Sequence, residues 1–242
     1  MTALPARLNG WQLFARFAFP PNELGYCGPP DASVLLEGRG RDDILGHAQG
    51  FDGAWPYLEE IAVASGLDDP LDADVVRNYW LGGSLLEAVD PGVLSARLRR
   101  VFARQPTGLL DRIHGCALAH HSFHVFVVYP WIRFLDVDPT TPLRILQACR
   151  IRWGVVDSVD DEHVVLVSRA LELAGGRLRL GEQVAESVRW CRDGVALAPS
   201  PSPGDTVAAH WDWTCGPLSE SEVGALAAAT AQTLDLVNSA RR

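Results

Sequence analysis

Cys149 stands at the start of a strand-like segment, and its thiol is the most chemically versatile group there. From Arg150 to Val155 polar and apolar residues alternate, which is typical of a half-buried strand. A thiol at the edge of such a strand binds soft metals or a partner's cysteine, provided that it is exposed and its pKa is lowered. The alternative is a small buried hydrophobic residue, which is how most free cysteines behave.

A second strand-like segment carries a histidine and a carboxylate two residues apart. Thr206 to Trp213 alternates, so His210 and Asp212 are predicted to share one face. A carboxylate beside an imidazole orients it, as acidic groups do for metal-binding histidines. We predict that Cys149 and His210 lie near one edge of the C-terminal part, where an imidazolium would lower the pKa of a surface thiol. The alternative for His210 and Asp212 is the polar outer face of a strand.

Histidines crowd the middle of the chain. His114, Cys116, His120, His121 and His124 fall within eleven residues. His120 and His124 share a face whether this segment is a helix or a strand, and imidazole suits iron, nickel and zinc. The spacing therefore predicts a metal site at His120 and His124. Because the cluster contains no carboxylate, the alternative is a set of histidines that line an interface or form buried hydrogen bonds.

The loop from Asn22 to Pro30 is rich in glycine and proline and carries three groups suited to binding. These are Glu23, Tyr26 and Cys27. We predict a binding loop, since binding residues are common on loops held by a rigid scaffold. A tight connection with Cys27 packed inside would explain the same glycines and prolines.

The elements that must position these residues change type at Cys149. Residues 1–148 are predicted to form a mostly helical domain, with Asp72 and Asp90 capping helices and a break at Pro130. Residues 149–242 are predicted to form a small β-structure followed by a helix from Ser219, where Ser219 and Glu222 form a capping box. The predicted fold class is therefore α+β.

Composition excludes several classes of protein. The chain has 242 residues and a net charge of −9, so nucleic acids and anionic membranes are poor partners. We see no signal peptide and no apolar run near the ~20 residues that span a bilayer. The odd number of cysteines, five, without a secretion signal indicates reduced thiols, and we expect a cytoplasmic protein without membrane insertion.

Two motifs in the C-terminal part resemble those of the HypC/HupF family of nickel–iron hydrogenase assembly chaperones. Cys149, Gly154 and Val156 match the spacing of the family's opening Cys-Leu-Ala-Ile/Val-Pro-Gly-Lys-Val motif. The segment Gly204–His210 matches Gly-Asp-x-Val-x-x-His, which precedes that family's last helix. Trp153 stands in place of the family's proline, and the family's cysteine is N-terminal whereas Cys149 is internal. The whole chain also resembles an uncharacterised actinobacterial family encoded beside hydrogenase genes, through Asn22–Gly28 and His120–His124.

The resemblance implies an OB-like β-barrel with a terminal helix, and an accessory role in hydrogenase maturation. The implied partner is the hydrogenase large-subunit precursor or another maturation protein, contacted through Cys149, with His210 and Asp212 nearby. We expect no required cofactor, and iron bound only transiently. Two other functions fit the residues: a thiol- or metal-dependent hydrolase using Cys27 or Cys149 with His120 or His124, and a structural subunit of a hydrogenase complex.

Overall fold

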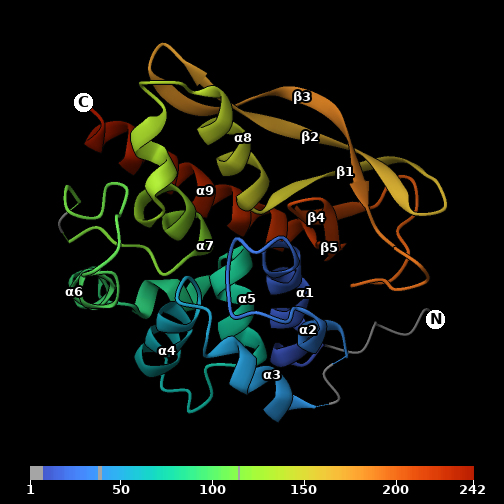
Figure 1. Cartoon of the computed structure of the whole chain (residues 1–242), viewed down its shortest axis with the longest axis horizontal. Helices are drawn as coiled ribbons and strands as arrows, with labels where there is room; N and C mark the ends of the chain where they lie inside the picture. Colours follow the sequence, from blue (N-terminus) through green and yellow to red (C-terminus); the bar gives the residue numbers. More distant parts are fainter. Residues whose placement is uncertain (1–7, 38–39, 114) are drawn as a thin grey trace.

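The computed structural model describes residues 8–37, 40–113 and 115–242, and it has the predicted α+β composition. Helices precede strands along the chain, and one long helix follows them (Figure 1). Within the described residues no strand precedes Arg152, so the predicted change of type at Cys149 is confirmed.

The helical part consists of short helices joined by tight loops. The α-helices here are α1 (Gly10–Glu23), α2 (Ser33–Glu37), α3 (Arg41–Ala48), α4 (Trp55–Ala64), α5 (Ala73–Leu81), α6 (Pro91–Val101), α7 (His121–Phe123) and α8 (Thr140–Cys149). The segments η1 (Ser84–Ala88) and η3 (Pro130–Phe134) are 3-10 helices, and η2 (His124–Val128) is a π-helix.

Two predicted helix caps and one predicted helix break are confirmed in this part of the chain. The carboxylate of Asp72 accepts a hydrogen bond from the backbone N–H of Asp74, and that of Asp90 caps α6. The chain also breaks where Pro130 predicts, because η2 ends before Tyr129 and η3 begins at Pro130.

The strands form one sheet in which every strand has two neighbours. Their bounds are β1 (Arg152–Val159), β2 (His163–Ala174), β3 (Arg177–Arg189), β4 (Thr206–His210) and β5 (Trp213–Pro217). The order β1-β2-β3-β5-β4 closes on itself through the antiparallel β1–β4 pair. All pairs are antiparallel except β3–β5, which meet in parallel at Arg189 and Trp213.

The prediction of a single strand from Thr206 to Trp213 was wrong. The chain turns at Trp211 and Asp212, with Trp211 at a φ of 53°, and returns antiparallel as β5. The alternation therefore stops at His210. Asp212 is exposed at the turn while His210 is buried, so these two side chains do not share a face.

The main apolar core crosses the boundary predicted at Cys149. It runs from α1 through α5 and the segment around α7 to Cys149, Trp211 and Trp213, and it includes residues of the last helix, α9 (Glu220–Ala240). A smaller cluster inside the sheet contains Val156, Val164, Leu166, Val188, Val207 and Ala209. In Figure 1, α9 lies between the helices and the long β2–β3 hairpin. None of the described helices is both long and apolar enough to cross a membrane.

Asn238 fixes the end of α9 against β3. Its side-chain amide donates to the backbone oxygen of Leu178 and accepts from the backbone N–H of the same residue, both at 2.8 Å. Because Leu178 is buried, its two backbone groups would lack partners in an Asn238→Ala variant. We expect a loss of about 2 kcal/mol in the free energy of unfolding, measured by urea denaturation. Ser239→Ala at the exposed neighbour should cost below about 0.5 kcal/mol, and equal losses would contradict the assignment.

Candidate functional site

The central histidines face different surroundings because His120 has extended backbone at the N-cap of α7, whereas His121 and His124 are helical. His120 is the N-cap of α7, where its Nδ1 accepts from the backbone N–H of Ser122 at 3.0 Å. His121 and His124 line an internal pocket. The predicted pair of His120 and His124 is thus divided between a cap and the pocket, and His114 lies outside the described residues.

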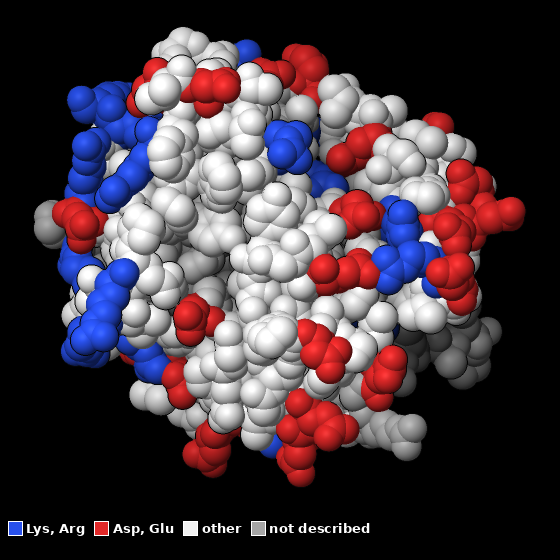
Figure 2. Space-filling model, in the orientation of Figure 1, with Lys and Arg blue, Asp and Glu red and all other residues white. Residues whose placement is uncertain are grey.

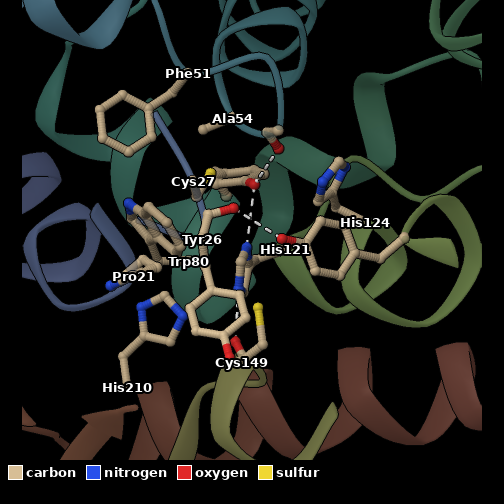
Figure 3. A pocket seen from close by; sticks show the side chains of 13 residues that line it. Pro21, Tyr26, Cys27, Phe51, Ala54, Trp80, His121, His124, Cys149 and His210 are labelled. Atoms are coloured by element: carbon tan, nitrogen blue, oxygen red, sulfur yellow. Dashed lines mark hydrogen bonds between the residues drawn. The ribbon is translucent and has the colours of Figure 1, made fainter. Parts of the chain in front are cut away.

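Three donors from three elements converge in this pocket (Figure 3). They are His121 of α7, Cys149 at the end of α8 and His210 at the end of β4. One nitrogen from each ring and the Cys149 sulfur all lie within 4.8 Å of one another. The three side chains are buried, with exposures of 6%, 8% and 0% respectively. Cys149 and His210 therefore meet as predicted, and His121 joins them.

The His210 ring is oriented by the helical part of the chain. Its Nδ1 lies 2.6 Å from the backbone oxygen of Phe17 in α1, an atom that only accepts hydrogen bonds. Nδ1 therefore carries the proton, and Nε2 keeps its lone pair. Among the described residues this buried Nε2 has no hydrogen-bond partner. A buried lone pair without a donor is uncommon and requires an explanation.

The contacts of His121 and the Tyr79 hydroxyl require more protons than these two neutral groups carry. Its Nδ1 is 3.1 Å from Tyr79 Oη, that hydroxyl is 2.7 Å from the backbone oxygen of Gly53, and its Nε2 is 2.9 Å from the backbone oxygen of Cys149. These three contacts need three protons. A neutral imidazole and one hydroxyl supply two, and burial keeps the imidazole neutral by lowering the pKa of His121 to about 4. If the first two contacts hold, Nε2 also carries a lone pair.

Burial, more than any neighbouring charge, determines the protonation of Cys149 and His210. Removal from water raises the pKa of the Cys149 thiol well above its ordinary value, and nearby Cys27 raises it further. Burial also lowers the pKa of His210 well below its ordinary value. The expectation of a surface thiol activated by an imidazolium is therefore wrong, since both groups are buried and neutral at pH 7.

The pocket around these donors is small, enclosed and apolar. Its volume is about 20 Å³, which is room for one water-sized particle. Aromatic rings form much of its wall: Phe51, Tyr79, Trp80, Tyr26 and Tyr129. A single ion bound by the three donors fits this space.

Tyr26 and Cys27 of the predicted binding loop belong to the pocket wall, and Glu23 does not. The Tyr26 ring stacks on Trp211 with a centroid distance of 4.1 Å. Asn22 holds the loop by donating to the backbone oxygens of Cys27 and Pro29. Glu23 instead forms an ion pair with Arg192, which fastens the end of α1 to the segment after β3.

The sequence did not identify His121 or Tyr79 as residues of the site. The only signal for His121 was its membership of the histidine cluster, where the i, i+4 spacing favoured its neighbours. Asp212 had been grouped with His210, but it lies exposed in the turn before β5 because the strand alternation ends one residue earlier.

Arg152 holds together the segments that flank Cys149 and His210. This buried guanidinium donates to the backbone oxygen of Ala148 at 3.1 Å and to that of Trp211, and it pairs with Glu186. We expect Arg152→Met to lower the free energy of unfolding by about 3 kcal/mol, since it leaves buried acceptors without donors. Urea denaturation measures this. Arg179→Met breaks an exposed ion pair with Glu172 and should cost at most about 1 kcal/mol. A similar small loss for Arg152→Met would contradict this role.

Comparison with known proteins identifies the family of this chain but assigns that family no function. Residues 6–242 match the model of a family described as "Family of unknown function (DUF6390)". No curated protein and no solved structure matches the chain. Since the match covers nearly the whole chain, this protein belongs to the DUF6390 family.

Proposed function

We propose that this protein binds a transition-metal ion at His121, Cys149 and His210 and acts as an accessory protein in the maturation of a nickel–iron hydrogenase. The observation that carries the proposal is the convergence of Cys149 and His210, the two motif residues, with His121 in one buried site. Iron is then a cargo that is bound and passed on.

The donor set suits a transition metal. One thiolate and two imidazoles bind iron, nickel, zinc or copper, whereas magnesium and calcium prefer oxygen ligands. Metal–ligand bonds to such atoms are about 2.0–2.3 Å long. Donor atoms within 4.8 Å of one another need only small side-chain movements to reach one ion.

The hydrogen bonds behind both histidines also support a metal site. Metal-binding histidines usually donate their second ring N–H to a carbonyl or another fixed acceptor. His210 donates from Nδ1 to Phe17, and His121 faces Tyr79 and then Gly53 in the same way. The unpartnered Nε2 of His210 is then left for the ion, and an ion bound at His121 Nε2 would take the place of its contact with the backbone oxygen of Cys149.

The hydrogenase context rests on the motif resemblance. A closed five-stranded sheet followed by a terminal helix agrees with the OB-like module that the resemblance implies. The described cysteines are free, as metal-binding thiols must be. We infer that the partner is the large-subunit precursor or another maturation protein.

The burial of these groups favours metal binding over catalysis by a thiol-dependent hydrolase. A cysteine nucleophile needs an accessible thiolate, stabilised by a nearby positive charge. Here burial raises the pKa of Cys27 to about 12 and that of Cys149 further, and it keeps His121, His124 and His210 neutral. Binding of a metal cation displaces a thiol proton without an imidazolium.

Titration with Co²⁺ as a probe tests the site. We expect one ion per chain and the absorption band of a cobalt–thiolate bond. Cys149→Ala should abolish the band, because it removes the only thiolate of the set. The matched control is Cys215→Ala, which removes another buried thiol that does not line this pocket and should keep the band. An unchanged band in Cys149→Ala would contradict the proposal.

A pull-down tests the hydrogenase part of the proposal. We expect the wild-type protein to recover the large-subunit precursor from a host that makes the hydrogenase, and we expect Cys149→Ala to recover much less while remaining folded. Recovery of mature hydrogenase by both proteins alike would indicate a structural subunit. Recovery of no hydrogenase component would refute the accessory role and leave the metal site standing.

A further inference from the structure

Cys27 and His124 lie where the enclosed pocket meets an open groove. Both residues line both cavities. The groove has a volume of about 430 Å³, and Phe102, Pro106 and Trp131 form part of its wall. Figure 2 shows this face of the molecule hollowed near its middle, with mostly uncharged atoms around the hollow. Tyr26, Gly53 and Tyr129 also line both cavities, and among these five shared residues Cys27 and His124 supply the thiol and the imidazole.

We propose that Cys27 and His124 form an outer pair of ligands through which the metal ion passes between the groove and the inner site of His121, Cys149 and His210. This inference rests on the proposed metal binding, and it assigns a transfer route to that site.

Two backbone N–H groups influence the Cys27 thiol at this boundary. Those of Gly28 and Gly53 lower its pKa, against the larger effect of burial, which raises it. Gly28 has a φ of 84°, and a Cβ there would lie 2.4 Å from the Phe51 ring, so this turn requires glycine. Backbone N–H groups stabilise a thiolate once it forms. A thiolate at this position is thus suited to hold a cation for a short time.

The His124 ring is held by Tyr57 and lines both cavities. Its Nδ1 lies 3.3 Å from the hydroxyl of Tyr57, which fixes the orientation of the ring. The side chain is only 6% exposed, yet it lines the pocket. A Cβ on Gly53 would lie 2.8 Å from Nε2, so the absence of a side chain at Gly53 keeps this nitrogen accessible.

The outer pair is separate from the inner set. Cys27 and His124 are not among the donors that lie within 4.8 Å of one another. Figure 3 shows them on the side of the pocket near Phe51 and Ala54, while Cys149 and His210 lie at the other end. One ion therefore occupies either the outer pair or the inner set, and three ligands hold it more firmly than two.

Transfer along this route conserves charge and leaves the oxidation state of the ion unchanged. When a divalent ion binds Cys27, a metal–sulfur bond replaces the S–H bond and the proton leaves to solvent in the groove. When the ion moves inward, Cys149 gives up its proton as the new metal–sulfur bond forms. Cys27 takes up a proton as its own bond to the ion breaks.

Stopped-flow loading with Co²⁺, followed by removal with EDTA, tests the route in the full-length protein. We expect Cys27→Ser and His124→Gln to slow both rates by about tenfold or more while the cobalt–thiolate band at equilibrium is retained. The matched control is Cys191→Ser, since Cys191 is also half-buried but lines neither cavity. Gly53→Ala, whose methyl group would cover His124 Nε2, should slow both rates while keeping all five donors.

Each other outcome overturns the inference. Unchanged rates in Cys27→Ser and Gly53→Ala would show that the ion takes another path. Faster rates in Cys27→Ser would show that the thiol only blocks the opening. Loss of the equilibrium band in Cys27→Ser would make Cys27 a ligand of the inner site. If the wild-type protein shows no band that depends on Cys149, the metal site itself fails, and this result is distinct from a failure of the route alone.

Discussion

The junction between Ala148 and Trp211 is the contact on which the rest of the site depends. The backbone oxygen of Ala148 accepts from the Trp211 N–H at 2.8 Å and from the buried Arg152 guanidinium at 3.1 Å. Cys149 and His210 are the immediate neighbours of these two residues. Because the junction fixes backbone to backbone, the thiol and the imidazole are brought together before any ligand binds. Removing a guanidinium from water costs free energy, and here its hydrogen bonds to the backbone carbonyls offset that cost.

Desolvation then determines what the assembled groups can do. In water a thiol beside histidines would be partly ionised and reactive. In this apolar pocket the neutral forms of Cys27, Cys149 and His210 are favoured, since no opposite charge is near enough to compensate for burial. Neutral imidazoles are metal ligands, and a cation supplies the charge that favours the thiolate. The same burial that weakens the case for hydrolysis therefore strengthens the case for metal binding.

The sequence predicted those parts of the site that depend on local pattern. Cys149 and His210 were found through motif spacing, and the change from helix to strand followed from periodicity. His121 could not be singled out, because its approach to Cys149 is a tertiary contact between α7 and the end of α8 that local pattern does not show. Asp212 was misplaced for a related reason: a turn centred on Trp211, with positive φ, interrupts an alternation that continues in the sequence. Tertiary contacts decided both positions.

The three donors come from both halves of the chain, so the site lies where the helices meet the sheet. His121 comes from the helical part, Cys149 from the end of the last helix before the sheet, and His210 from a strand that packs on α1. An ion held by all three would cross-link the helices and the sheet, so binding adds stability where the two parts meet. An accessory protein must also release what it binds. A firmly closed inner site is compatible with release only if a weaker set of ligands lies between it and solvent, and Cys27 and His124 occupy that position.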